Sequence, residues 1–285
     1  MGFTYMLGRS WNTLVGVRKV PRFFMPSNEN TKSQIKSRQR VAQHGEVFTN
    51  PREVNAMLDL VRDESFRLDS RFLEPACGDG NFLIEILRRK LSIIENIKSQ
   101  TEWEFKSLIA VGSCYGIELL EDNAEACRQR LFGYVLSQHP DLKQNHPEKT
   151  TSERLNLNNP TQTTKERSVG VSSSEVMRLE ETRPQNQYTI SLRYMLRKNI
   201  VCGDALTYRT ADGKPITFCE WTPIAGSMQF SRRDFQFDFL VNQTHQYSLF
   251  DEQGEAQSFD EPVRSYPPLH YTQLYRYEEQ DTHSI

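Results

Sequence analysis

The stretch from Leu73 to Phe82 constrains the fold of this chain more than any other part of the sequence. The run from Arg71 to Glu74 predicts a short strand, and the residues from Pro75 to Gly80 predict a tight turn. Apolar residues then recur at helical spacing up to Ile94. Glycines after a buried strand let the backbone approach a ligand, and the following helix presents free amides. The pattern suits a nucleotide-like ligand, although a G-x-G turn alone is also an ordinary strand-to-helix connection.

The neighbouring segments continue the same alternation of strand and helix. Asn50 to about Asp63 has apolar residues at helical spacing, with Pro51 at the first helical position. Ile109 to Glu118 predicts a second strand, and Glu121 to Val135 predicts another helix. Strands and helices that alternate at these lengths form parallel sheets covered by helices. We therefore expect an α/β fold.

The second half of the sequence predicts two more strands after a polar interruption. Asn199 to Asp204 predicts a third strand and turn, and Phe237 to Val241 predicts a fourth. From Gln138 to Gln187 polar residues dominate, and such a segment cannot bury enough apolar surface to order itself. The expected divisions are a basic, flexible arm (1–43), the first half of the domain (44–137), a disordered insertion (138–190), the second half (191–245) and an acidic, aromatic-rich tail (246–285).

Composition limits the class of protein further. No apolar run approaches the roughly 20 residues needed to cross a bilayer, so we expect no membrane span and a soluble protein. The five cysteines form no C-x-x-C pair, which argues against a zinc site or a disulfide framework and favours a reducing, cytoplasmic setting. Net charge is only -2, but basic residues gather before Gly45 and acidic residues after Asp251. A basic arm can hold phosphates, and two solvated termini explain the asymmetry equally well.

Four short motifs resemble those of one enzyme family. Glu118 ends the predicted second strand, where an acidic side chain can accept hydrogen bonds from ribose hydroxyls; as a lone residue it is also a helix cap. The stretch from Glu74 to Phe82 resembles motif I of the S-adenosylmethionine-dependent DNA adenine methyltransferases of restriction-modification systems. The residues from His44 to Pro51 resemble the G-E-x-[FY]-T-P element of that family. Tyr115 to Glu118 resembles its motif II, and Gly203 to Leu206 resembles its motif III.

The resemblance implies a role for each matching residue. Phe48 and Thr49 would line the cofactor, and Glu118 would hold its ribose hydroxyls. The turn after the first strand would lie beside the methionine moiety; its candidate residues are Glu74, Ala76, Cys77, Gly78, Asp79 and Gly80. Asp204 would accept a hydrogen bond from the adenine amino group, with Ala205 or Leu206 against the ring. Thr49 could instead belong only to a helix start, and Asp204 could be a turn residue.

The chain departs from the family at its catalytic motif. These enzymes carry the motif [DNS]-P-P-[YFW] after the fourth strand. The polar residue of the motif holds the target amine, and its aromatic residue stacks on the flipped base. Here Asn242 stands at the amide position and His245 at the aromatic one, without the two prolines. The only Pro-Pro pair, Pro267-Pro268, follows no apolar strand and predicts an extended linker or edge segment.

The resemblance therefore implies a Rossmann-like class I methyltransferase sheet with helices on both faces. About forty residues follow Asn242, fewer than the family has, so the C-terminal part of the fold is expected to be short. The implied activity is methyl transfer from S-adenosylmethionine to the N6 amine of adenine in DNA, without a metal. The implied partners are DNA and a specificity, restriction or second methyltransferase subunit. Alternatives are a catalytically degenerate cofactor-binding or DNA-binding subunit, and a methyltransferase for RNA or protein.

Two groups of charged residues receive structural interpretations. Trp221 with Arg232-Arg233-Asp234 could contact nucleic acid, but local packing with a surface ion pair is favoured. The run Arg88-Arg89-Lys90 predicts a solvated helix face.

Overall fold

Three parallel strands form the centre of the first sheet. The computed structural model describes residues 5–7, 14–16, 49–140, 186–242 and 262–282. In it β3 (Arg71–Glu74), β4 (Cys114–Glu118) and β5 (Ile200–Asp204) lie side by side, with Glu74 opposite Gly116 and Glu118 opposite Cys202. The carboxyl ends of all three strands therefore meet at one edge. The predicted α/β architecture is confirmed.

Antiparallel strands extend this sheet on both sides. β1 (Tyr5–Leu7) pairs with β3, and β2 (Leu14–Gly16) pairs with β1. On the other side β6 (Arg209–Thr210) pairs with β5, so the order is β2-β1-β3-β4-β5-β6. β1 and β2 come from the segment that the sequence predicts to be a flexible arm, so parts of that segment belong to the sheet.

Three of the described α-helices begin after a residue whose side chain caps them, namely Asn50, Ser99 and Asn186. Asn50 accepts a hydrogen bond from the Arg52 amide and starts α2 (Pro51–Asp59). One helix was expected up to Asp63, but Val61 leaves the helical conformation and separates α2 from the single-turn α3 (Arg62–Ser65). The remaining helices of this part are α4 (Asn81–Ser92), α5 (Gln100–Gly112), α6 (Glu121–Ser137) and α9 (Gln187–Asn199).

The predicted second strand is half wrong. Ile109 to Gly112 continue α5, which starts at the Ser99 cap, and only Cys114 to Glu118 are extended. A short apolar run does not by its period distinguish a buried helix end from a buried strand. The third strand is confirmed as β5.

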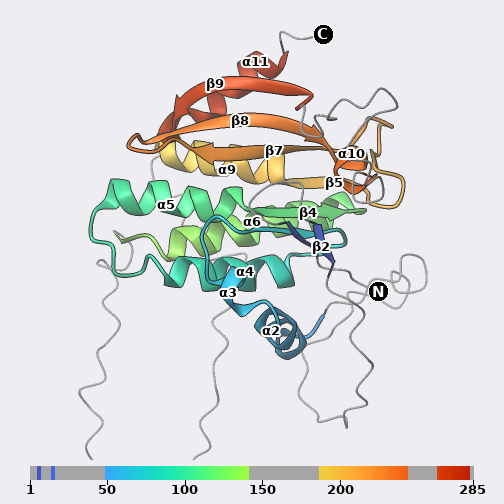
Figure 1. Ribbon diagram of the computed structural model, residues 1–285, viewed down its shortest axis with the longest axis horizontal. Helices are drawn as coiled ribbons and strands as arrows, with labels where there is room; N and C mark the ends of the chain where they lie inside the picture. The colour runs from blue at the N-terminus through green and yellow to red at the C-terminus, as the bar shows by residue number, and fades with distance from the viewer. Residues whose placement is uncertain (1–4, 8–13, 17–48, 141–185, 243–261, 283–285) are drawn as a thin grey trace, which may run out of the picture.

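The two faces of the parallel strands pack differently. Phe72 and Cys114 belong to the core that contains the apolar sides of α4 and α6. Alternate residues, including Leu73 and Tyr115, belong to a second core with Phe218, Phe235 and Phe237. In the described residues this second face is thus covered by strand ends and one short helix, whereas the sequence led us to expect a helical layer there. Figure 1 shows α4 and α6 on the other side of the parallel strands.

A second, antiparallel sheet consists of β7 (Thr217–Pro223), β8 (Gln229–Gln236) and β9 (Arg264–His270). It lies over α5 and α9 (Figure 1), and η2 (Tyr271–Arg276) and α11 (Tyr277–Thr282) follow it. β9 contains Pro267-Pro268 and pairs only with β8 among the described strands, so the edge-segment prediction is confirmed.

The predicted fourth strand is wrong. Phe237 to Asn242 form α10, a short helix directly after β8. Phe237 and Leu240, three residues apart, both belong to the second core, a spacing that a helix satisfies and a strand does not. Asn242 therefore ends a helix.

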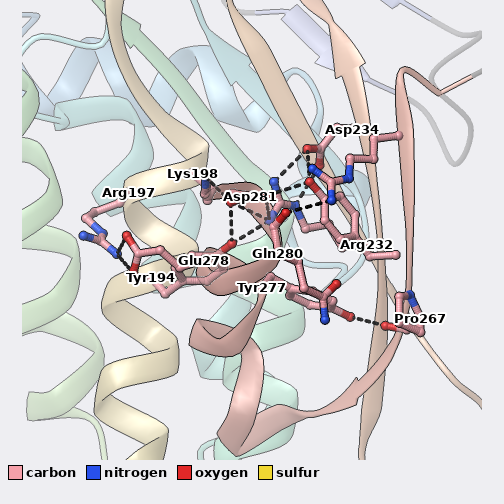
Figure 2. A network of polar contacts seen from close by, with 12 residues as sticks. Tyr194, Arg197, Lys198, Arg232, Asp234, Pro267, Tyr277, Glu278, Gln280 and Asp281 are labelled. Atoms are coloured by element: carbon pink, nitrogen blue, oxygen red, sulfur yellow. Dashed lines mark hydrogen bonds and ion pairs between the residues drawn. The ribbon is translucent and has the colours of Figure 1, made fainter. Parts of the chain in front are cut away.

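In the group around Trp221, the residues Trp221, Arg232 and Asp234 are buried, whereas Arg233 is exposed. The guanidinium of Arg232 donates two hydrogen bonds of 2.7 Å to the carboxylate of Asp234, and both residues are more than nine-tenths buried. Asp281 from α11 lies on the other side of Arg232 (Figure 2), 3.1 Å away, and Tyr266 donates to Asp281. Local packing is confirmed, but the ion pairs of Arg232 are internal and join β8 to α11, whereas Arg233, with its side chain 45% exposed, pairs with Glu220.

The solvated face predicted for Arg88-Arg89-Lys90 is wrong for two of the three residues. Arg89 is 7% exposed, and its guanidinium binds Asp59 at 2.8 Å and Asn55 at 2.9 Å. Lys90 is fully buried, where its ammonium donates to the carbonyls of Leu68 and Ser70.

No helix in the described ranges is long and apolar enough to span a membrane.

The burial of Lys90 predicts a specific pH dependence of stability. Desolvation lowers the pKa of Lys90 from 10.5 to about 8. Between these two pKa values the unfolded chain binds a proton that the folded chain has lost, so the free energy of unfolding rises with pH in that interval. Below the interval the folded chain bears the full cost of burying the charged ammonium. We expect the wild type to gain about 2 kcal/mol in free energy of unfolding relative to Lys90→Met between pH 7 and 9.5. Urea unfolding at both pH values measures this, and a constant difference would refute it.

Candidate cofactor site

The turn between β3 and α4 is built on two glycines in the left-handed conformation. Gly78 has φ 55° and Gly80 has φ 92°, which side chains other than glycine adopt at a cost of roughly 1–2 kcal/mol. A Cβ at Gly80 would lie 2.7 Å from the Sγ of Cys127 on α6. The Cys77 amide donates to the carbonyl of Ile117 at 2.9 Å. The turn is thus fixed against the end of β4, where α6 approaches it closely.

Glu118 connects this turn to the next strand. Its carboxylate is 8% exposed and accepts from the Gly78 amide at 2.8 Å, the Leu120 amide at 3.1 Å and the Asn123 side chain at 3.3 Å. Both expected features, the helix-start contact and the position beside the glycine turn, are present in one side chain. The structure thus brings Glu118 and the turn together, 40 residues apart in sequence.

Two cysteines pack beneath the turn. Cys77 and Cys127 are both buried, and a hydrogen bond with Cys127 and desolvation together raise the pKa of the Cys77 thiol well above its usual value. A Cβ at Gly116 would lie 2.9 Å from the Cys77 Sγ, so the glycine of the Tyr115–Glu118 motif makes room for this thiol. Cys77 is therefore a packing residue whose backbone, rather than its sulfur, is presented at the site.

Asp79 and Thr49 are linked through α4 and α6. Nη1 of Arg130 donates to the Asp79 carbonyl at 2.8 Å and to Oδ1 of Asn81 at 3.0 Å, and lies 2.9 Å from the Asp79 Oδ1. Asn81 in turn donates to the Thr49 carbonyl at 3.2 Å. Arg130 was not expected at the site, because nothing near it in sequence resembles a motif.

The end of β5 contributes the third edge of the site. Oδ1 of Asp204 accepts from the Leu206 amide at 2.8 Å, so Asp204 has the role of a turn residue. The same turn leaves Ala205 half-buried and Leu206 89% exposed. Leu119, directly after Glu118, is 56% exposed. Leu119 was missed by the sequence reasoning, although an apolar residue after the acidic one was a usable signal.

The remaining candidate residues differ in their exposure and in whether they belong to the described part of the chain. Glu74 is 3% exposed at the end of β3, whereas Ala76 is exposed on the turn. Thr49 is half-buried at the start of the described segment. Phe48 and His245 lie outside the described residues, and Asn242 is the last residue of α10. The structure therefore brings together the turn, Glu118 and the Asp204 loop at one edge, and leaves the expected catalytic pair unassembled.

The carboxyl edge of three parallel strands, with a glycine turn and an acidic residue on the next strand, is an arrangement that nucleotide ligands use. Comparison with known proteins gave one finding. The profile described as MmeI, DNA-methyltransferase domain, matches residues 50–209, more than half of the chain, from the cap of α2 to β6. No curated protein and no solved structure gave a significant match.

Proposed function

The chain belongs to the family of the MmeI DNA-methyltransferase domain, and from this membership we propose that it transfers a methyl group from S-adenosylmethionine to the N6 amine of adenine in DNA. The family supports a DNA methyltransferase of restriction-modification type, with DNA as substrate. The observation that carries the cofactor assignment is the contact between the buried Glu118 carboxylate and the Gly78 amide at adjacent strand ends.

The residues of the edge fit the adenosine part of this cofactor. A carboxylate has about four acceptor positions, and the described residues use three of those on Glu118. Ribose hydroxyls would take the remaining position and compete with the long bond from Asn123. Leu119 and Leu206 offer exposed apolar side chains for the adenine ring, and the Asp204 Oδ2 is the acceptor for its amino group.

The turn also fits the charged methionine part. Among the described residues, the buried Oδ1 of Asp79 has no hydrogen-bond donor of suitable geometry, although Arg130 lies beside it. A buried anionic oxygen requires a donor, and the α-ammonium of the cofactor is one. When bound, the sulfonium supplies an electrophilic methyl group. The chain's own contribution is to bind the cofactor and to orient it. We expect the sheet that does so to be Rossmann-like.

The acceptor side rests on Asn242, with His245 as the stacking residue. In this proposal the Asn242 amide orients the adenine amine toward the cofactor. The helical rather than extended approach to Asn242 favours a second candidate, a subunit that binds the cofactor without catalysis and acts with a specificity, restriction or second methyltransferase subunit.

One experiment separates these candidates. The chain and an Asn242→Ala variant are expressed in a host without DNA methylation, and the DNA is read by modification-sensitive sequencing. We expect N6-methyladenine in one defined sequence for the wild type and a loss of at least about 100-fold in the variant, because a preorganised polar group acting in the transition state contributes that much to the rate. Unmodified DNA, from a protein that still binds S-adenosylmethionine, would support the non-catalytic subunit. Methylation of RNA alone would contradict the DNA assignment.

A further inference from the structure

We propose that Arg130 is a positioning residue for the cofactor, holding the β3–α4 turn and the Thr49 segment in one arrangement while leaving one Asp79 oxygen for the ligand. The inference rests on the proposed function and deepens it. Arg130 lies on α6, the helix after β4, and contacts the turn at residues 51 and 49 positions before it in sequence.

Nη1 of Arg130 has more neighbouring oxygens than it has hydrogens to donate. Nη1 of Arg130 has three oxygens within 3.0 Å: the Asp79 carbonyl, the Asp79 Oδ1 and the Asn81 Oδ1. A terminal guanidinium nitrogen carries only two hydrogens. The hydrogen bonds go to the Asp79 carbonyl and to Asn81, so the Asp79 Oδ1 gains the nearby positive charge but no hydrogen. Arg130 thus lies beside the Asp79 carboxylate without donating a hydrogen bond to its Oδ1.

Arg130 also fixes the orientation of the Asn81 side-chain amide. Its oxygen accepts from Arg130, so its nitrogen faces the other way and donates to the Thr49 carbonyl. Arg130 therefore fixes which way this amide points. Without the guanidinium the amide is free to turn, and the bond to Thr49 is lost in the turned arrangement. Two of the candidate cofactor residues, Asp79 and Thr49, are in this way held by one side chain on α6.

The nature of the side chain matters for this role. A guanidinium presents hydrogens in fixed planar directions, whereas a lysine ammonium is a point charge on a flexible stem. Lysine at position 130 keeps the charge beside Asp79 but does not hold both oxygens in the same geometry. We therefore expect Arg130→Lys to restore only part of the effect of arginine.

The test measures cofactor affinity in a double-mutant cycle on the full chain. Arg130→Ala is expected to raise the Kd for S-adenosylmethionine about 10-fold by calorimetry, and Arg130→Lys about 3-fold, since one charged hydrogen-bond arrangement is lost or weakened. In an Asn81→Ala background the effect of Arg130→Ala should fall to about 3-fold, because the two residues act through each other. The matched control is Gln129→Ala on the same helix, an exposed residue whose side chain donates a hydrogen bond to the exposed Glu125.

The outcomes separate this proposal from the function on which it rests. A wild type that does not bind the cofactor overturns the proposed function and this inference with it. A wild type that binds, together with an Arg130→Ala variant that binds equally well, overturns the positioning role alone. An Arg130→Ala variant that loses affinity only in proportion to a lowered melting temperature, with no coupling to Asn81, would mark Arg130 as merely structural. Loss of affinity at unchanged melting temperature, with coupling, supports the proposal.

Discussion

Replacing Glu118 with alanine is expected to weaken S-adenosylmethionine binding by about 10- to 100-fold. A hydrogen bond to a charged group contributes roughly 1.5–3 kcal/mol, and the substitution also removes the acceptor that holds the Gly78 amide. Calorimetry on the purified chain measures the change. Glu118→Gln keeps the shape but not the charge, and should fall between the wild type and the alanine variant.

The control for Glu118 is Glu125→Ala. Glu125 lies on α6 in an ion pair with Arg128, with its side chain 51% exposed, and among the described residues its hydrogen bonds are to Arg128 and Gln129, outside the candidate site. We expect the Glu125→Ala variant to bind S-adenosylmethionine as tightly as the wild type does. If Glu118→Ala binds as tightly as Glu125→Ala while the wild type binds well, Glu118 does not hold the ribose and the site lies elsewhere.

The second large effect is on stability. Asp234→Ala should lower the free energy of unfolding by about 3–5 kcal/mol, because it leaves the Arg232 guanidinium buried without its bidentate partner. The side chains of the pair are only 3% and 10% exposed. Urea unfolding followed by circular dichroism gives the value.

Two comparisons test the reason for this loss. Glu278→Ala breaks an exposed pair with Arg197, whose side chains are 55% and 54% exposed, and should cost no more than about 1 kcal/mol. The double variant Arg232→Met with Asp234→Leu removes both charges and should be more stable than Asp234→Ala. If the double variant is the less stable of the two, loss of the bidentate partner of a buried guanidinium is not the cause.

Local patterns were enough to predict the centre of the fold. The strand–turn–helix from Arg71 onward, the position of Glu118 and the third strand ending at Asp204 each depend on residues close in sequence. Parallel pairing then places their ends together. The predictions that failed concern short apolar runs: Ile109 to Gly112 and Phe237 to Val241 fit a strand or a buried helix equally well, and tertiary packing decided for the helix.

Contacts between distant residues could not be predicted in this way. Arg89 and Lys90 read as surface residues because the partners that bury them, such as Asp59 and Leu68, are more than twenty residues away. Arg130 carries no motif, and its link to Asp79 exists only because α6 packs beside the turn. Candidate site residues that belong to a motif could therefore be named from the sequence, whereas Arg130 could not.

Hydrogen exchange with and without S-adenosylmethionine tests the proposed cofactor site, because it locates the ligand on the chain. We expect the cofactor to slow amide exchange in three separate segments at the carboxyl edge of the sheet: 76–80, 117–120 and 204–206. The segment 264–270 in the antiparallel sheet serves as the internal reference and should be unchanged. Protection of these three segments together would establish the site. Unchanged exchange at saturating cofactor, or protection confined to other segments, would contradict the account.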